Sequence, residues 1–258
     1  MPNRQGPNGI DWCHYTWNPL HGECLNDAPC KEYCYMERMY RQHPELRHPI
    51  ELNEKELSWN PGKPCIVFAE SRLEFLHPAM NRTWQEAVIE HMGRNRHVNY
   101  VILSKLPERY SQFNWPRNCW LGTTVDGLPH TADNVYKLMT NVRPDYVRFV
   151  SYEPLLREPN ASWLLPLPPP TMTYVPEQLG TLDWIIIGAD SNRGAEQPPT
   201  RWARTLAVNA RSMGIKVFVK ANYKTYSQAR KDNEMPGNWY IDREGKIRQR
   251  REAQLELF

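Results

Sequence analysis

Short apolar segments recur along the chain and predict buried strands. Each is rich in valine, isoleucine or aromatic residues, and several are apolar almost throughout rather than alternating with polar residues. That pattern is typical of parallel strands covered on both faces. The segments are CIVFAE (65–70), VNYVILSK (98–105), CWLGTTV (119–125), YVRFVSYE (146–153), LDWIIIGAD (182–190) and KVFVK (216–220).

Helical patterns fill most of the gaps between these predicted strands. They cover residues 83–94, 106–113, 131–142 and 200–214. We expect the first helix to begin with Thr83 as its N-cap, because Glu86 lies three residues later and completes a capping box. We expect the last helix to end at Gly214, since glycine is favoured just past the end of a helix.

Strands that alternate with helices indicate βαβ units and a parallel sheet. At least six units in one series predict an α/β fold in the form of a partial parallel (β/α) barrel. A doubly wound sheet is the main alternative, but no GxGxxG sequence follows the first strand. The proline-rich segment 159–180 interrupts the series and predicts a surface excursion.

The domain prediction is a partial barrel over residues 1–223, with a C-terminal extension over 224–258. The extension carries the basic segment KIRQRR (246–251). This segment could contact phosphate, but a solvated basic tail is the interpretation that we favour.

Composition narrows the classes of protein that fit. An apolar fraction of 40% in 258 residues can supply a core for one large α/β domain or two small ones. No run of about 18 apolar residues appears, as a membrane span would need. The N-terminal sequence MPNRQGPNGIDW lacks the apolar stretch of a secretory signal. We therefore expect a cytoplasmic protein whose thiols stay reduced, and the net charge of +3 neither requires nor excludes a nucleic-acid partner.

Three of the six cysteines are crowded into the segment HGECLNDAPCKEYCYMER (21–38), at Cys24, Cys30 and Cys34. Reduced thiols argue against a disulfide and favour a metal. Iron–sulfur clusters usually take four thiolates, so a four-iron cluster held by three cysteines leaves one iron open. S-adenosylmethionine (SAM) is the substrate that binds such an iron, and its reductive cleavage gives a 5′-deoxyadenosyl radical. Tyr33 stands where an aromatic residue could support the adenine of SAM.

Two other interpretations of the cysteines stay open. Zinc also takes four ligands as a rule, and His21 or Cys13 could complete a zinc site in a nucleic-acid-binding module without catalysis. A metal-free hydrolase or lyase that uses glutamate and lysine side chains leaves the cysteines unexplained. Cys65 and Cys119 begin predicted strands and are expected to be buried, inert thiols.

Polar residues stand at the C-terminal end of every predicted strand, where parallel barrels gather their chemistry. We expect most of these residues to face one cleft. Glu70 and Ser71 are placed to bind the amino group of methionine, and Thr123, Thr124 and Glu153 to bind the ribose or the carboxylate. The catalytic candidates are Glu153, Asp190 and Lys220; the cofactor-binding candidates are Tyr33, Glu70, Ser71, Thr123, Thr124 and Ser191; the cluster ligands are Cys24, Cys30 and Cys34.

The chain resembles a phage-associated family that has a radical-SAM-like three-cysteine motif. The matching stretches run in the family's order from about residue 10 to 223: IDWCHYTWNPLHGEC, CKEYCYMERM, FAESRLEFLHP, VILSKLPERY, CWLGTTV, VRFVSYEPLL, LDWIIIGADSNRGAEQPP and VFVKANY. Two features differ from the common pattern. The cysteine spacing is C-x5-C-x3-C rather than C-x3-C-x2-C, and Asp190 stands where members often have glutamate.

The resemblance also suggests a substrate. Some relatives are encoded beside genes for DNA hypermodification, where a radical enzyme has been proposed to rearrange an amino-acid-decorated thymine. It implies an isomerase that converts an N-linked glycyl group on thymine in phage DNA to a C-linked one, with an external electron donor, in the cytoplasm of a phage-infected or prophage-bearing bacterium. The cofactor would supply the radical that unactivated bonds require, and the base would be flipped out of the duplex. Basic residues near the cleft could contact phosphate or carboxylate: Arg38, Arg72, Lys105, Arg193 and Lys220.

Overall fold

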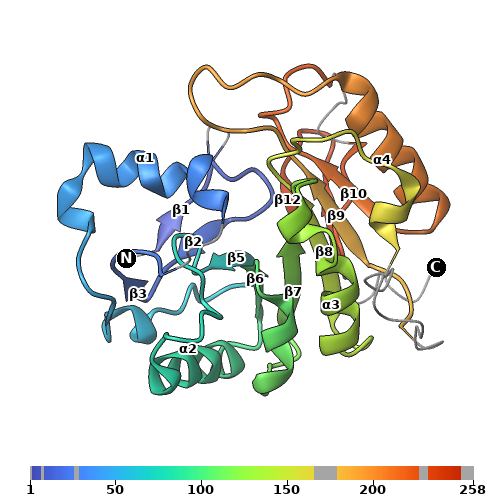
Figure 1. Cartoon of the computed structure of the whole chain (residues 1–258). Coiled ribbons are helices and arrows are strands. Elements are labelled where there is room, and N and C mark those ends of the chain that lie inside the picture. The colour runs from blue at the N-terminus through green and yellow to red at the C-terminus, as the bar shows by residue number, and fades with distance from the viewer. Residues whose placement is uncertain (1, 7–8, 26–28, 166–178, 227–231, 251–258) are drawn as a thin grey trace.

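A mostly parallel sheet of eight strands forms the centre of the α/β fold (Figure 1). The computed structural model describes residues 2–6, 9–25, 29–165, 179–226 and 232–250. In sheet order the strands are β1 (Asn3–Arg4), β2 (Tyr15–Trp17), β5 (Cys65–Ala69), β6 (Val98–Ser104), β7 (Cys119–Thr124), β8 (Val147–Tyr152), β9 (Trp184–Ile187) and β10 (Lys216–Val219). Only the β1–β2 pair is antiparallel. The predicted strands are confirmed as β5 to β10, whereas β1 and β2 are too short for a periodic pattern to reveal them.

The strand order argues against one of the two predicted topologies. From β5 to β10 each strand pairs with the one before it, so the order never reverses. A doubly wound sheet requires a reversal, and that alternative is wrong. Within the residues that the structure describes, the edge strands β1 and β10 do not pair with each other, and no closed barrel forms.

Helices connect consecutive parallel strands and pack on one face of the sheet (Figure 1), as right-handed crossovers require. These elements are α2 (Arg82–Arg94), η4 (Pro107–Gln112), α3 (Asn134–Asn141) and α4 (Thr200–Ser212). The helix predicted over 106–113 is a 3₁₀ helix. The predicted cap at Thr83 is wrong, because the Asn81 side chain accepts hydrogen bonds from the backbone N–H groups of Thr83 (3.0 Å) and Trp84 (3.3 Å). Gly214 follows α4 with a φ of +74°, which agrees with its predicted role.

Smaller elements complete the chain. The two hairpins are β3 (Leu20–His21) with β4 (Glu51–Leu52) and β11 (Trp239–Ile241) with β12 (Ile247–Gln249). The remaining helices are η1 (Pro29–Glu32), α1 (Tyr35–Gln42), η2 (Pro44–Leu46), η3 (Glu56–Ser58), η5 (Pro129–Thr131) and η6 (Ala161–Leu164). The proline-rich residues 166–178 lie outside the described residues. No helix in the described ranges is long and apolar enough to cross a membrane.

The face of the sheet opposite the helices has its own aromatic core. Alternate strand residues point there, as the two-residue period of a strand requires. Strand residues such as Phe68, Phe149 and Trp184 pack there with Trp12 from the N-terminal segment and Trp239 from the C-terminal extension. The sheet is therefore covered on both faces, which explains why its strands read as continuous apolar runs.

Hydrogen bonds join the C-terminal extension to the sheet. The Trp239 indole donates to the Asn99 side chain at 2.7 Å, and the Trp184 indole donates to the backbone carbonyl of Glu234 at 2.9 Å. Part of the basic charge of KIRQRR is paired locally, since Arg248 contacts Asp242 at 2.9 Å. Residue 251 of that segment lies outside the described residues.

Candidate active site

A cavity of about 500 Å³ lies at the carboxyl ends of the parallel strands. Apolar side chains from the aromatic core on the sheet face opposite the helices, including Trp12, Phe68 and Leu103, contribute to its wall. Eleven of the twelve residues proposed from the sequence as site residues line it: Cys24, Cys30, Tyr33, Cys34, Glu70, Ser71, Thr124, Glu153, Asp190, Ser191 and Lys220. The structure thus brings the cysteine segment and the polar strand ends to one space.

Thr123 is the exception among the candidate site residues. It is fully buried, does not line the cavity, and its hydroxyl donates to the backbone carbonyl of Ser104 at 2.8 Å. Adjacent side chains of a strand point to opposite faces, so Thr124 reaches the cavity and Thr123 packs towards the helices. Arg193, one of the basic residues expected near the cleft, does not line the cavity either.

The three clustered cysteines occupy one wall. Cys30 lies in η1, and Cys34 immediately precedes α1. Burial raises the pKa of the Cys30 thiol, the charge of Lys105 opposes the rise, and Cys34 and Cys24 add to it, so these groups lie close enough to interact. Among the described residues, which omit 26–28, no group of three or more His, Cys, Asp or Glu side chains is arranged to hold a metal ion.

Hydrogen bonds tie the cysteine segment to the strand ends around the cavity. The Tyr33 hydroxyl donates to the Asp126 carboxylate after β7, and the Asn192 amide donates to the Tyr33 carbonyl at 2.8 Å. The Tyr35 hydroxyl donates to the Ser71 carbonyl at 2.6 Å. Tyr33 and Tyr35 flank Cys34, so this thiol is held between two anchored residues. The Tyr33 ring is part of the wall, where it could support an adenine, while its hydroxyl is committed to Asp126.

We expect Tyr33→Phe to lower the free energy of unfolding by about 2 kcal/mol, because its hydroxyl donates to a buried carboxylate. Tyr35→Phe is the matched control. Its hydroxyl donates to a neutral carbonyl, and the side chain is 41% exposed, so the expected loss is about 1 kcal/mol or less. Urea unfolding of both variants measures the difference. Equal losses would contradict the anchoring role of Tyr33.

Glu70 has an unusual conformation at the end of β5. Its φ is +53°, a left-handed value that is uncommon for residues other than glycine. One carboxylate oxygen, Oε1, accepts the backbone N–H of Leu20 at 3.0 Å, whereas Oε2 is buried and has no hydrogen-bond partner among the residues that the structure describes. Burial raises the pKa of this carboxyl well above its usual range, although the bond from Leu20 opposes the rise. A buried acceptor without a partner is costly, so Glu70 is suited to a ligand that donates a hydrogen bond.

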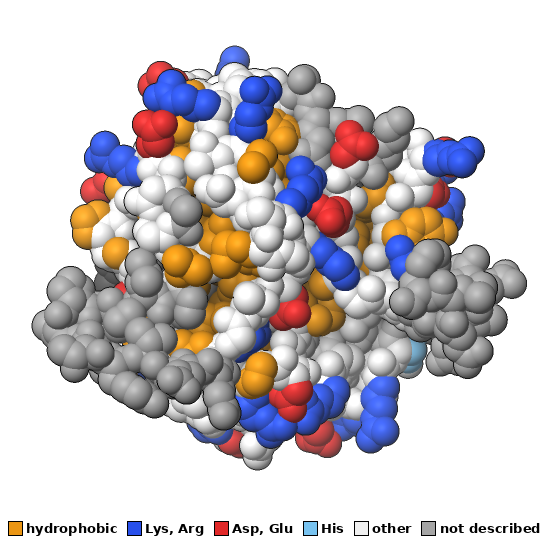
Figure 2. All heavy atoms as spheres, turned by 90° about the vertical axis from the view of Figure 1, so that its right-hand side faces the viewer, with side chains coloured by type: hydrophobic (Ala, Val, Ile, Leu, Met, Phe, Trp, Pro, Cys, Tyr) orange, Lys and Arg blue, Asp and Glu red, His pale blue; other side chains and the backbone are white. Residues whose placement is uncertain are grey.

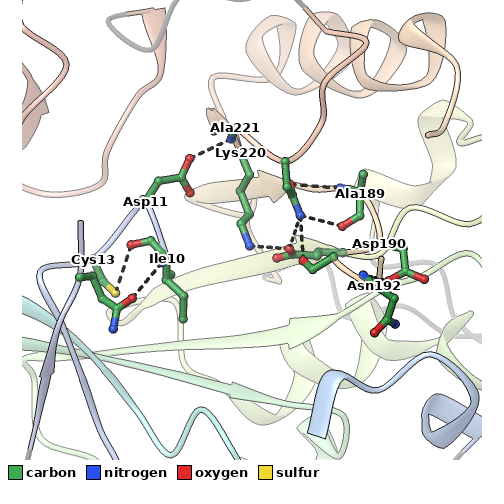
Figure 3. Close-up of polar contacts among 12 residues, drawn as sticks. Ile10, Asp11, Cys13, Ala189, Asp190, Asn192, Lys220 and Ala221 are labelled. Atoms are coloured by element: carbon green, nitrogen blue, oxygen red, sulfur yellow. Dashed lines mark hydrogen bonds and ion pairs between the residues drawn. The ribbon is translucent and has the colours of Figure 1, made fainter. Parts of the chain in front are cut away.

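A polar network at the ends of β8, β9 and β10 also lines the cavity. Lys220, at the end of β10, forms an ion pair with Glu153 after β8, and the Asn222 amide donates to Glu153 Oε1 at 3.1 Å (Figure 3). Asn222 also donates to the Ser191 hydroxyl at 3.1 Å. Gly188 leaves room for this arrangement, because a Cβ there would lie 2.8 Å from the Glu153 carboxyl carbon. Lys220 and Glu153 were predicted from the sequence as site residues, whereas Asn222 was not.

The N-terminal segment was missed as part of the site. The Asp11 carboxylate accepts the backbone N–H of Ala221 at 2.9 Å and so joins this segment to the end of β10 (Figure 3). Ile10 lines the cavity, and its N–H donates to Gln5 at 2.9 Å. No local pattern in the sequence announces contacts between residues more than 200 positions apart.

The remaining cysteines lie away from the cavity. Cys13, Cys65 and Cys119 are buried in the two cores and do not line it. Burial raises the pKa of the Cys65 thiol to about 12, which makes it a poor nucleophile and metal ligand. His21 does not line the cavity either. Neither Cys13 nor His21 therefore shares this space with the three clustered thiols.

Comparison with known proteins identifies a family whose function is unknown. The model of the family described as "Protein of unknown function (DUF5131)" matches residues 7–252. No curated protein and no solved structure matches the chain.

Proposed function

The chain belongs to the DUF5131 family, and we propose that it is a radical SAM enzyme built on a partial parallel barrel. The observation that carries this proposal is the meeting of three clustered cysteines and the polar strand ends in one cavity. The sequential strand order and the helices on one face also support a partial barrel. The location of the cavity at the carboxyl ends of the strands is typical of barrel enzymes.

The three cysteines are of the residue type that a four-iron cluster takes, although the described residues do not hold them in a metal-binding arrangement. Thiolates are the protein ligands that such clusters take, and Cys24, Cys30 and Cys34 would be these ligands, in the wall of a cavity large enough for a small molecule. When bound together, the cluster and SAM supply a carbon-centred radical that abstracts hydrogen from an unactivated carbon. The electron comes from an external donor.

Glu70 carries the argument for SAM. The Oε2 atom of Glu70 is a buried acceptor without a partner beside the cavity, and the amino group of SAM is a cationic donor of the kind that it needs. The hydroxyl groups of Ser71, Thr124 and Ser191 also line the cavity and would bind the polar edge of the cofactor. The Tyr33 ring would support the adenine.

The wall formed by Glu153, Asp190 and Lys220 would face the substrate. The Lys220–Glu153 pair, held by Asn222, can orient a polar substrate group and can hold or release a proton beside it. We propose a modified nucleobase as that substrate, and most concretely a glycyl-decorated thymine in phage DNA, isomerised from an N-linked to a C-linked form. The base would leave the duplex to enter the cavity.

Anaerobic reconstitution tests the radical chemistry. The full chain is incubated with iron and sulfide, reduced with dithionite and supplied with SAM, and 5′-deoxyadenosine is measured. We expect a brown protein that forms this product. A protein that takes up zinc instead, stays colourless and forms no 5′-deoxyadenosine would overturn the proposal in favour of a zinc-stabilised binding module.

The substrate has a separate test. The reconstituted enzyme is incubated with DNA that carries glycyl-thymine, and the digested nucleosides are separated. A nucleoside of unchanged mass and shifted retention is the expected product. If only 5′-deoxyadenosine forms, the radical activity stands and the DNA substrate does not.

A further inference from the structure

Two arginines in the cavity wall lack a protein partner. Arg38 lies on α1 and Arg72 follows β5, and both are half-buried and line the cavity. Neither side chain forms an ion pair or a hydrogen bond with another residue in the described ranges. A partly buried guanidinium without a partner loses hydration that nothing restores, so such a group is costly unless an anion binds it.

Some arginines on the outside of the protein form ion pairs. Arg211 contacts Glu234 at 2.8 Å and Arg248 contacts Asp242 at 2.9 Å. On the face shown in Figure 2, basic and acidic side chains are interspersed. Such a mixed surface does not favour an anionic ligand, in contrast to the wall that carries Arg38 and Arg72.

The local structure brings these two arginines to the same part of the wall. The bond between the Tyr35 hydroxyl and the Ser71 carbonyl joins the first turn of α1 to the residue immediately before Arg72. Arg38 lies three residues after Tyr35, and residues at that spacing share a face of a helix. The two guanidinium groups therefore extend from neighbouring points of the wall.

Among the acids that line the cavity, Glu70 interacts electrostatically with Arg72 but is not within ion-pair distance of it in the described ranges, and three others have different partners. Glu37 is bonded to Arg47 at 2.7 Å. Glu74 accepts the Ser104 hydroxyl at 2.5 Å and the backbone N–H of Lys105 at 2.8 Å. Glu153 is paired with Lys220. The cavity is thus lined by the Lys220–Glu153 ion pair and by two arginines, Arg38 and Arg72, that have no ion-pair partner among the described residues.

We propose that Arg38 and Arg72 form a subsite that binds an oxyanion of the substrate. The planar fork of arginine matches carboxylate and phosphate oxygens equally well. The identity of the ligand rests on the proposed function, which offers two sources: a phosphate of the DNA strand, or the carboxylate of the glycyl group on the base. The subsite itself requires neither the cluster nor SAM.

Binding to the full chain without iron tests the subsite independently of the radical chemistry. One ligand is a single-stranded decathymidylate, which has phosphates and no carboxylate. The other is the glycyl-thymine nucleoside, which has a carboxylate and no phosphate. Affinities are measured by tryptophan fluorescence for the natural sequence, Arg38→Gln and Arg72→Gln. Arg204→Gln, on the exposed side of α4, makes the same charge change and is the control.

We expect Arg38→Gln and Arg72→Gln each to lower the affinity for one of the two ligands roughly tenfold or more, as the loss of a charged hydrogen bond predicts. The control Arg204→Gln should leave both affinities unchanged. If the decathymidylate is the affected ligand, the salt dependence of its binding should also become shallower. Arg38→Lys and Arg72→Lys keep the positive charge and should retain part of the affinity. Such retention would show that the loss in the glutamine variants does not come from misfolding. Absence of binding of either ligand to the natural sequence, or equal weakening by Arg204→Gln, would overturn the subsite even if 5′-deoxyadenosine is formed.

Discussion

Cys24→Ala, Cys30→Ala and Cys34→Ala should each lose the iron of the reconstituted protein and lower 5′-deoxyadenosine formation by more than about a hundredfold. The loss of an outer-shell partner already costs roughly 10–100-fold in metal affinity or activity, and loss of a ligand should cost more. Iron determination together with the visible absorption of each variant measures the first effect. Product analysis measures the second.

Cys65→Ala is the matched control for these substitutions. Its thiol is buried in the helix-side core and does not line the cavity, so iron content should be unchanged. A Cys30→Ala protein that retains a complete cluster and responds to SAM would show that the three cysteines are not its ligands. Equal loss of iron in Cys65→Ala would point to damage of the fold instead.

Lys220→Met should strongly reduce turnover and also destabilise the protein. Lys220 forms an ion pair with Glu153. Breaking a fully buried ion pair by removing one partner costs about 3–5 kcal/mol. The two side chains are 12% and 20% exposed, so we expect a loss of about 2 kcal/mol in the free energy of unfolding. Positioned acid–base groups contribute roughly 10²–10⁴-fold to rates, and the activity should fall by a factor in this range.

The double variant Lys220→Met/Glu153→Gln separates the two effects. Removing both charges leaves neither member of this pair as an unpaired charge, so part of the stability should return while activity stays low. Arg211→Met, which breaks the exposed pair with Glu234, should have a much smaller effect on stability. If the double variant regains activity together with stability, the pair has only a structural role.

The periodic part of the fold could be predicted from the sequence, because buried parallel strands and amphipathic helices leave strong local patterns. The six central strands follow from such patterns. Strand β2 could not be predicted, since it has only three residues. The N-cap of α2 was misplaced by two residues, because Asn81 and Thr83 are both acceptable caps and only the path of the chain decides between them.

In the candidate site, too, only the residues that a local sequence pattern places could be predicted. Parallel strands place their carboxyl ends at one edge, so Glu70, Glu153 and Lys220 could be assigned to one space before the structure was known. Thr123 was misassigned because adjacent side chains of β7 point to opposite faces of the sheet, so only one of the two neighbouring threonines can face the cavity. The sequence alone does not show which one it is. The contact of Asp11 with Ala221 joins residues 210 positions apart, and no local pattern predicts it.

The aromatic core opposite the helices has a consequence for synthesis on the ribosome. Trp12 and Phe68 leave the ribosome early, whereas Trp239, which packs in the same core, is among the last described residues to emerge. Chains fold from the N-terminus as they are made, so this face stays exposed to solvent through most of translation. A nascent chain stalled near residue 223 would present Phe149 and Trp184 without their C-terminal cover, which makes it a ready target for chaperones and for aggregation.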